Sequence, residues 1–291
     1  MDVADLRSEA EVKAKTLVEA LPYIRAYRGQ TVVVKIGGAA LEDARLAGLV
    51  ADDLALMAFV GIRVIVVHGG GPQVSEAMAE AGIEPMFADG LRVTDDAAIE
   101  VVRRVLVGTI NADLVMKLCA AGLAAVGLWG SDGKLIDATF FEPSSGRHLG
   151  RVGRVTQVRS NLLHHLLDGG YTPVIASVAP GDDGRALNIN ADAVAASIAG
   201  SVGAAKLVYM TNVEGLYRDL GDAGSLVSEL KLDELTGMIA ELSDGMRPKA
   251  GSAKQALESG VGRIHILDGR VEHALLLEVF TNEGIGTQVL P

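Results

Sequence analysis

From residue 31 onward, short runs of β-branched residues alternate with longer amphipathic segments. The run Thr31–Ile36 precedes a helical pattern near 42–60, and the run IRVIVV at 62–67 precedes another at 73–81. Parallel strands need a long crossover between them, and a helix is the usual one. The alternation therefore predicts an α/β fold in which helices cover both faces of a mainly parallel sheet. In such sheets, ligands bind outside the carboxyl ends of the strands.

The rest of the chain continues the alternation without a low-complexity linker. Further strands are predicted at 123–128, 172–178, 206–211, 262–267 and 287–290, and further helices at 95–121, 159–168, 193–200, 231–241, 250–259 and 271–279. The turn-rich stretch 129–158 is expected to form hairpins. We therefore expect two lobes of one compact unit, dividing near residue 180.

Ahead of the first strand, apolar residues at helical spacing predict an amphipathic helix at 3–21. Pro22 is expected to break or kink this helix. It has no sheet partner of its own, so it packs either against the body of the protein or against another subunit. The segment mixes acidic with basic residues, unlike a transit or secretory signal, and a cytosolic protein is expected.

Composition excludes several classes of protein. A net charge of −11 over 291 residues argues against a nucleic-acid binder, which needs a basic face. One cysteine, Cys119, excludes an internal disulfide, and its apolar surroundings LVMKLCAAGL predict a small core residue in a reducing compartment. No run of 18 apolar residues occurs, so no membrane span is expected.

Two predicted strands end in glycine clusters. Lys35 and Gly37-Gly38 close the first, and His68-Gly69-Gly70-Gly71 follows the second. Glycines allow backbone N–H groups to approach an anion closely, and a following helix adds its positive end. Neither cluster has the Gly-Lys-Ser/Thr of a P-loop or the spacing GxGxxG, which argues against a dinucleotide site. His68 is more typical of a hydrogen-bonded turn residue than of a catalyst.

Polar residues gather at two later junctions. Arg92 lies just before a helix that Thr94 could cap, and it is either a surface residue or a clamp for a substrate carboxylate. Asn188, Asn190 and Asp192 lie where a strand turns into a helix. Asn190 is well placed to cap that helix, with Asp192 in its first turn. Capping explains only one of these three residues, so the excess favours a site.

A lysine at a helix start is electrostatically unfavourable unless an anion shares the place. Lys249 immediately precedes the helix predicted at 250–259, so it is a second cation that needs a phosphate. The segment Met210–Tyr217 follows another strand, where the base and ribose of a nucleotide are expected.

Taken in order, these segments resemble the amino-acid kinase family from about residue 30 to residue 291. The matching motifs are VVVKIGGAAL, VVHGGGPQV, LRVTD, LNINADAVAASIA, TNVEGLY, GMRPKAGSAKQAL and LLLEVFTNEGIGTQVLP. The resemblance implies a three-layer α/β/α sandwich around a mainly parallel central sheet. Within the family, the motifs are most similar to members that use ATP to phosphorylate the side-chain carboxylate of N-acetyl-L-glutamate in arginine biosynthesis.

The resemblance also implies roles for individual residues. Lys35 and Lys249 would contact the transferring phosphoryl group, and Asp192 would hold the two lysines in place. The residues implied for N-acetyl-L-glutamate are Gly70, Gly71, Arg92 and Asn188. Those implied for ATP are Lys35, Gly37, Gly38, Thr211, Asn212, Gly215 and Lys249.

The chemistry agrees with that assignment. A side-chain carboxylate with a pKa of about 4.3 is already ionised at neutral pH, so the reaction needs no general base. The catalytic work is then alignment and charge neutralisation. The sequence shows no carboxylate cage for a metal, so Mg²⁺ is expected to sit on the ATP phosphates.

The added N-terminal helix and the tail HALLLEVFTNEGIGT resemble the arginine-inhibited, hexameric members of the family. The resemblance implies a helix for oligomerisation at 1–28, an N-lobe for N-acetyl-L-glutamate at 29–180, and a C-lobe for ATP and arginine at 181–291. The residues implied for the arginine effector are Tyr23, His265, Glu278 and Gly284. The alternative is that Glu278 lies on a solvated helix face and Tyr23 only packs.

Three other functions remain to be compared. The first is another kinase of the family, acting on glutamate, aspartate, carbamate or UMP. A free amino acid would need an acidic partner for its ammonium group, and the substrate-side motifs offer arginine, asparagine and glycines instead. A non-catalytic amino-acid sensor on the same fold would be expected to lose Lys35, Asp192 or Lys249, and all three are present. A nicotinamide-dependent dehydrogenase is disfavoured by the missing GxGxxG.

Overall fold

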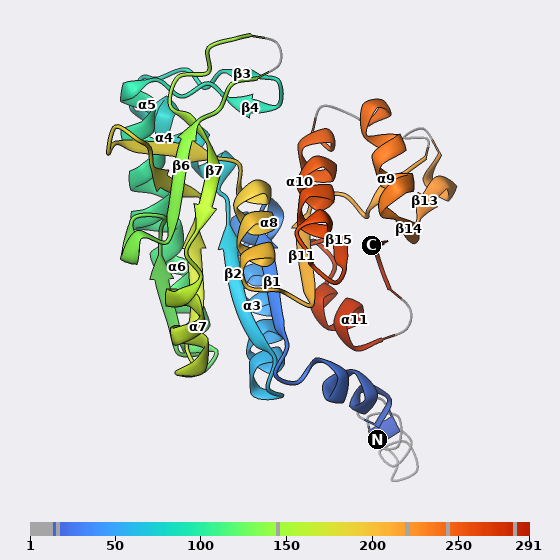
Figure 1. Cartoon of the computed structure of the whole chain (residues 1–291). Helices are drawn as coiled ribbons and strands as arrows, with labels where there is room; N and C mark the ends of the chain where they lie inside the picture. Colours follow the sequence, from blue (N-terminus) through green and yellow to red (C-terminus); the bar gives the residue numbers. More distant parts are fainter. Residues whose placement is uncertain (1–13, 16–17, 144–145, 219–221, 243–244, 282–283) are drawn as a thin grey trace.

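A continuous eight-stranded sheet runs through the centre of the protein (Figure 1). The computed structural model describes residues 14–15, 18–143, 146–218, 222–242, 245–281 and 284–291. The strand order is β14-β16-β15-β11-β1-β2-β8-β5, and every pair is parallel except β15–β16. The strands are β1 (Thr31–Ile36), β2 (Arg63–His68), β5 (Ala125–Leu128), β8 (Thr172–Ala176), β11 (Lys206–Thr211), β14 (Glu229–Lys231), β15 (Ile264–Asp268) and β16 (Thr287–Leu290).

Helices cover both faces of this sheet, because successive residues of its central strands point to opposite sides. Val33 belongs to the core beneath one set of helices, whereas Val32 and Val34 belong to the core beneath the other. The first set is α7 (Asn161–Asp168), α8 (Ala191–Ser201), α9 (Leu232–Met238) and α10 (Arg247–Glu258). The second is α2 (Ala39–Glu42), α3 (Ala44–Phe59), α4 (Gly71–Glu80), α5 (Asp96–Arg103), α6 (Asn111–Ala120) and α11 (Ala274–Phe280). The predicted α/β architecture is confirmed.

Smaller sheets surround the carboxyl ends of the central strands. The four-stranded one has the order β6-β7-β10-β9, and its antiparallel pair β6–β7 is the hairpin predicted within 129–158. Its strand β10 lies beyond residue 180 but pairs with β7 and β9 of the preceding part of the chain. The strands are β6 (Ile136–Phe140), β7 (Val152–Val158), β9 (Val178–Pro180) and β10 (Ala186–Ile189), and the two-stranded pairs are β3 (Phe87–Ala88) with β4 (Leu91–Arg92), and β12 (Leu216–Tyr217) with β13 (Leu226–Val227).

The long helix predicted at 95–121 contains a π-helical segment. It forms as α5, the π-helical segment Arg104–Ile110 and then α6. Such segments occur frequently at functional sites. Here Leu106, from the middle of the segment, lies on the wall of a cavity at the carboxyl ends of β1 and β2.

One local prediction was wrong in part, and another was wrong. Residues 18–27 are helical without a break at Pro22, and the rest of the helix predicted at 3–21 lies mostly outside the described residues. Cys119 is exposed rather than part of the core, because it lies on the outer face of α6 near the end of that helix. Within the described part of the chain, we find no helix that is both long enough and apolar enough to cross a membrane.

Candidate active site

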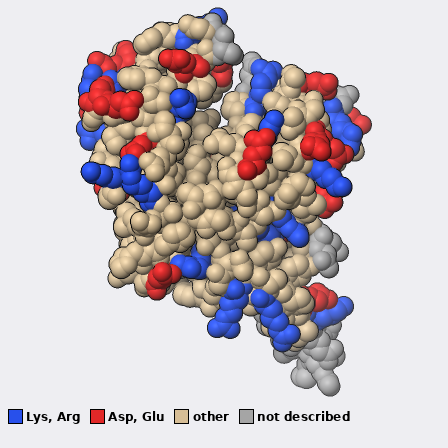
Figure 2. All heavy atoms as spheres, viewed as in Figure 1, with Lys and Arg blue, Asp and Glu red and all other residues tan. Residues whose placement is uncertain are grey.

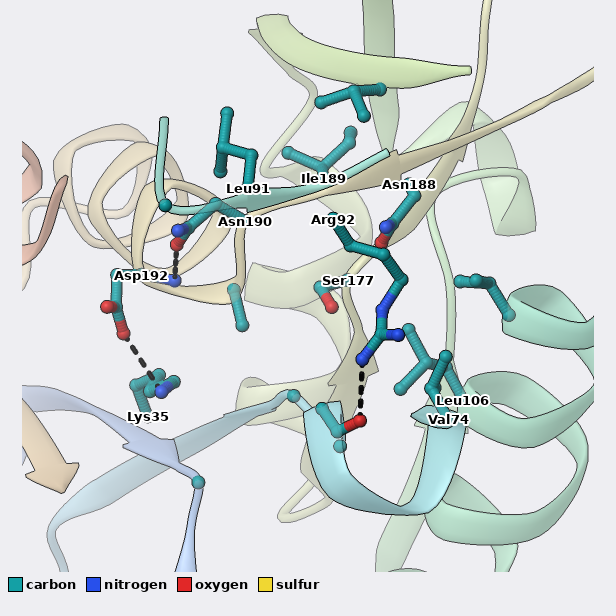
Figure 3. A pocket seen from close by; sticks show the side chains of 18 of the residues that line it. Lys35, Val74, Leu91, Arg92, Leu106, Ser177, Asn188, Ile189, Asn190 and Asp192 are labelled. Atoms are coloured by element: carbon teal, nitrogen blue, oxygen red, sulfur yellow. Dashed lines mark hydrogen bonds and ion pairs between the residues drawn. The ribbon is translucent and has the colours of Figure 1, made fainter. Parts of the chain in front are cut away.

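A cavity of about 240 Å³ opens at the carboxyl ends of β1 and β2 (Figure 3). Its walls come from the glycine loops after these strands, from α4, from the β3–β4 hairpin, and from the junction of β10 with α8. Many of the residues predicted from the sequence line it, namely Lys35, Gly37, Gly38, Gly70, Gly71, Arg92, Asn188 and Asp192. The structure therefore brings segments that are up to about 150 residues apart in sequence into one site.

Two lysines converge on one carboxylate at the edge of this cavity. Lys35 Nζ lies 3.0 Å from Asp192 Oδ1, and Lys249 Nζ lies 2.8 Å from Asp192 Oδ2. The ring of Tyr209 lies beneath, with its centroid 5.3 Å from Lys249 Nζ. Because each lysine takes one oxygen of the same carboxylate, Asp192 fixes the relative position of the two amines.

The local sequence explains why these groups meet. Asn190 is the N-cap of α8, and its side-chain oxygen accepts from the backbone N–H groups of Asp192 and Ala193. Asp192 therefore lies in the first turn of α8, where its charge is favoured by the helix dipole. α10 packs against α8 and begins at Arg247, three residues earlier than predicted, so Lys249 lies within its first turn. Asp192 therefore provides an anion beside Lys249.

The charges of this cluster shift its pKa values. Burial alone would raise the pKa of Asp192, but the charges of Lys249 and Lys35 lower it well below its usual range. Burial lowers the pKa of Lys249, and the carboxylate of Asp192 opposes that effect. Two lysine amines pair with a single carboxylate in this cluster, and such an excess of cationic groups suits a phosphoryl group.

Arg92 points into the cavity and is 8% exposed, so the surface alternative is wrong. Its Nη2 donates to Gly71 O and to Ser75 Oγ, both at 2.7 Å, and its guanidinium lies 4.7 Å from the centroid of Phe87. Thr94 does not cap the following helix as predicted. Asp95 does so instead, because the Thr94 hydroxyl donates to Arg92 O and accepts from Asn188 Nδ2.

The predicted nucleotide residues lie in two places. Gly38 and Asn212 follow neighbouring strands, β1 and β11, and a Cβ added at Gly38 would lie 2.1 Å from Asn212 Oδ1. Since Gly38 also has a φ of +59°, a side chain there would be strained. Thr211 ends β11 beside this contact. Gly215 packs instead against Thr287 at the start of β16, away from the cavity lining.

A second, larger cleft of about 820 Å³ adjoins the cavity, and Figure 2 shows the surface hollowed there. Residues of α8 line it, with the β3–β4 hairpin and the loop after β6 on one side and α10 on the other. Phe87, Leu91 and Asn190 line both spaces. The cavity therefore opens towards a cleft between the part that carries Arg92 and the part that carries Lys249.

Three of the residues predicted for the arginine effector lie together. His265 belongs to β15, Glu278 to α11, and Gly284 to the segment between α11 and β16. His265 Nδ1 donates to Glu278 Oε1, and a Cβ added at Gly284 would lie 3.2 Å from the same oxygen. Glu278 is 6% exposed, so its placement on a solvated helix face is wrong. Burial alone would raise the pKa of Glu278, but its hydrogen bond with His265 lowers it. Tyr23 lies in the helical segment 18–27, which packs against the same core cluster as α11.

Sequence reasoning missed several residues at these sites. Phe87 stacks on Arg92, and Ser177 is buried in the wall of the cavity, yet neither belongs to a polar or glycine-rich motif. Lys206 lies near Glu278, and its amine is 4.5 Å from the ring centroid of Tyr27. Burial lowers the pKa of Lys206 to about 8. The sequence signal that could have identified Lys206 is its place at the start of the largely apolar strand β11.

Known proteins resemble this chain over nearly its whole length. A model of the amino acid kinase family matches residues 30–268. The acetylglutamate kinase of Symbiobacterium thermophilum is 50% identical over 285 residues, which are 96% of this chain and 97% of that protein. The structure of N-acetylglutamate synthase from Neisseria gonorrhoeae complexed with coenzyme A and N-acetyl-glutamate matches with a TM-score of 0.85 and 31% identity, over 96% of this chain and 63% of the synthase. The same synthase complexed with coenzyme A and L-arginine matches with a TM-score of 0.81 and 29% identity, over 95% of this chain and 65% of the synthase.

Proposed function

The chain belongs to the amino acid kinase family, and we propose that it transfers the γ-phosphoryl group of ATP to the side-chain carboxylate of N-acetyl-L-glutamate. The product is N-acetyl-L-glutamyl 5-phosphate, an intermediate of arginine biosynthesis. The observation that carries the proposal is the convergence of Lys35 and Lys249 on Asp192 at the edge of the cavity. The similarity to the acetylglutamate kinase of S. thermophilum supports the same acceptor.

The lining of the cavity favours an acylated amino acid over a free one. Among the described residues that line the cavity, Asp192 is the only acidic one, and two lysines already bind its oxygens. A free α-ammonium group would therefore have no carboxylate partner there. Arg92 offers a guanidinium to a carboxylate of the acceptor, and Asn188 offers an amide. The apolar side chains of Val74, Val102 and Leu106 suit an acetyl group.

In the proposed reaction, the side-chain carboxylate of the acceptor attacks the γ-phosphorus of ATP in line with the departing ADP oxygen. The carboxylate is ionised at neutral pH, so no residue has to remove a proton. Lys35 and Lys249 neutralise the charge that spreads over the transferring phosphoryl oxygens, and Asp192 keeps the two amines in place. Gly37 and Gly38 bring backbone N–H groups close to the phosphates of ATP.

ATP-dependent kinases use Mg²⁺, which neutralises phosphate charge. Within the described residues, no cluster of three or more histidine, cysteine or acidic side chains is suited to hold such an ion. The carboxylate of Asp192, which lines the cavity, is already paired with Lys35 and Lys249. We therefore assign Mg²⁺ to the phosphates of ATP rather than to a protein cage.

The two sides of the cleft are assigned to different ligands. We assign residues 29–180 mainly to the acceptor, and residues 181–291 to ATP and the effector, with Asn188 reaching the acceptor from the second part. An acyl phosphate hydrolyses readily, so the two sides of the cleft are expected to close over it and exclude water.

A hydroxamate-trapping assay tests the proposal, because hydroxylamine converts acyl phosphates into coloured hydroxamates. With ATP and Mg²⁺, N-acetyl-L-glutamate is expected to give a signal, while L-glutamate, L-aspartate and carbamate give none. A signal with L-glutamate or L-aspartate alone would assign the chain to a different kinase of the family. ADP release with UMP and no hydroxamate would point to a nucleotide kinase, and no turnover with any acceptor would favour a non-catalytic sensor.

We further propose that L-arginine inhibits the enzyme by binding near Tyr23, His265, Glu278 and Gly284. The buried carboxylate of Glu278 is suited to a bidentate pair with a guanidinium. In support, the related N-acetylglutamate synthase has been solved with L-arginine. Inhibition would require arginine to favour an arrangement of the cleft that ATP and N-acetyl-L-glutamate disfavour.

The Glu278→Gln substitution is expected to raise the concentration of arginine for half-inhibition by about tenfold or more, because the guanidinium loses its anionic partner. The measurement is the rate of acyl-phosphate formation against arginine concentration. Glu272→Gln is a matched control, since Glu272 is half-exposed in the turn just before α11 and pairs with Arg45. Equal arginine sensitivity in both variants would place the effector elsewhere.

We propose that the protein is a hexamer in which N-terminal helices join neighbouring dimers. Ala20, Tyr23, Ile24 and Tyr27 pack against the body, whereas Val18 and Leu21 are exposed and available to another subunit. These apolar side chains lie on the helix that the resemblance assigns to oligomerisation.

Deleting residues 1–28 is expected to reduce the assembly to dimers and to raise the arginine concentration for half-inhibition by at least about fivefold. The deletion removes the proposed contact between dimers and also Tyr23. Light scattering at equal protein concentration gives the assembly state of the full chain and the truncated chain. A truncated protein that remains hexameric would refute the role of this helix.

A further inference from the structure

Gly69–Gly71 line the cavity proposed for the acceptor and are called the acceptor loop below. His68 is fully buried beside this loop, and the proposed phosphoryl transfer does not use its side chain. It is the last residue of β2 and the first of the His68–Gly71 cluster. Its Nδ1 lies 2.9 Å from Gly69 O, and its Nε2 lies 3.0 Å from Asn111 Nδ2. Asn111 Nδ2 also donates to Val174 O at 2.9 Å. Both ring nitrogens are therefore engaged.

These partners define the state of the ring. A carbonyl oxygen only accepts, so Nδ1 carries the proton and donates it to Gly69 O. The group of Asn111 that faces Val174 O must be its NH₂, so Nε2 of His68 accepts from that group. Burial lowers the pKa of His68 to about 4, and the nearby charge of Lys35 acts in the same direction. The ring is therefore neutral in the physiological range.

Asn111 has little freedom to move. It is 5% exposed, and a Cβ added at Gly127 of β5 would lie 2.2 Å from its Oδ1. It thus spans three neighbouring strands, through His68 of β2, Val174 of β8 and Gly127 of β5. It also directly follows the π-helical segment. That segment packs Ile110 against the acceptor loop, since a Cβ added at Gly70 would lie 2.1 Å from Ile110 Cδ1.

The peptide that His68 holds leads directly into the acceptor loop. Gly69 N–H donates to Ile36 O at 3.2 Å, and Gly69 O accepts from the ring. The C=O and N–H of a trans peptide point in opposite directions, so fixing Gly69 O also fixes Gly70 N–H. Gly70 is the N-cap of α4 and makes no side-chain cap. The first N–H groups of α4 are thus open to an anion in the cavity that Gly70 and Gly71 line.

We propose that His68 is a positioning residue for the acceptor: its neutral ring, aligned by Asn111, holds the Gly69–Gly70 peptide so that the N–H groups of Gly70 and Gly71 bind a carboxylate of the substrate. The inference rests on the proposed function, since the acceptor is taken to be N-acetyl-L-glutamate. His68 acts through the backbone and does not touch the reacting atoms.

Two substitutions separate the two hydrogen bonds of the ring. The amide nitrogen of His68→Asn can occupy the place of Nδ1 and keep the bond to Gly69 O, whereas the amide oxygen of His68→Gln can occupy the place of Nε2 and keep only the bond to Asn111. Asparagine is one methylene shorter than glutamine, so a loss of packing alone would disturb His68→Asn more than His68→Gln. We expect the KM for N-acetyl-L-glutamate to stay within about threefold of wild type in His68→Asn and to rise about tenfold or more in His68→Gln. In both variants, kcat and the KM for ATP are expected to stay within about threefold.

The isosteric Asn111→Asp substitution gives a second readout that a purely structural role would not produce. The new carboxylate faces both Val174 O, to which it cannot donate, and His68 Nε2, from which it can accept. It therefore requires a proton on Nε2, so Nδ1 keeps its own proton only while the ring is doubly protonated. As the pH rises, the remaining proton stays on Nε2, and the lone pair of Nδ1 then faces Gly69 O. The KM for N-acetyl-L-glutamate is therefore expected to rise with pH in this variant relative to wild type.

The outcomes are distinct. Equal KM values in His68→Asn and His68→Gln would overturn the inference, as would an Asn111→Asp variant whose KM follows wild type at every pH. If neither His68 variant folds, the pH profile of Asn111→Asp decides. A wild-type protein that forms no acyl phosphate from N-acetyl-L-glutamate would overturn the proposed function and this inference with it.

Discussion

Replacing Lys249 by alanine is expected to lower kcat by about 10²–10⁴-fold and to leave the KM for N-acetyl-L-glutamate within about threefold of wild type. Lys249 is 5% exposed, and its amine lies 2.8 Å from Asp192 Oδ2, so its position is fixed before any substrate binds. A fixed cation of this kind interacts most strongly where charge develops during transfer. The acceptor residue Arg92 is untouched, so ground-state binding of the acceptor should persist.

Steady-state kinetics with both substrates varied gives the two constants separately. Lys254→Ala is a suitable control, because Lys254 lies on the same helix, α10, and pairs with Glu258 near the surface. That control is expected to keep wild-type turnover. A Lys249→Ala enzyme with unchanged kcat and a raised KM would show that Lys249 binds substrate and does not act on the transition state.

The parts of this site that could be predicted from the sequence are local or follow from sheet topology. The glycine cluster after Lys35 and the cluster after His68 meet because parallel strands present their carboxyl ends at one edge. Asn190 was predicted as a cap from its place between a strand and a helix, and it caps α8. Neither inference required knowledge of which helices pack together.

Other parts depend on long-range packing that periodicity does not encode. The position of Lys249 at a helix start predicted a phosphate as its anionic partner. Only the resemblance to the family indicated that Asp192 lies beside it. The structure supplies that anion because α8 and α10 pack side by side. Cys119 is exposed although its neighbours in sequence are apolar, because it occupies the outer face of α6. In these cases tertiary contacts decide which side of a helix is covered.

The Asp192→Asn substitution is expected to lower the free energy of unfolding at about pH 7 by about 3–5 kcal/mol, because it leaves the buried ammonium group of Lys249 and the partly buried one of Lys35 without an anion. Burial already lowers the pKa of Lys249, and removing the carboxylate takes away the charge that opposes this effect. The amine of Lys249 should then lose its proton at a lower pH. Turnover is expected to fall by about 10²-fold or more, since both cations lose their common support.

The difference in stability between wild type and Asp192→Asn should depend on pH in a defined direction. The folded pKa of Asp192 lies below the value of about 3.9 for an unfolded aspartate, so its contribution is fully present above that value. The contribution is lost as the pH falls below about 4 towards the folded pKa, and the two proteins should converge there. Urea unfolding at several pH values measures this difference. Asp168→Asn, which removes an exposed pair with Arg63, is the control and should change stability little at any pH. A constant difference down to about pH 3 would mean that the folded pKa of Asp192 is not lowered and that the loss arises from packing.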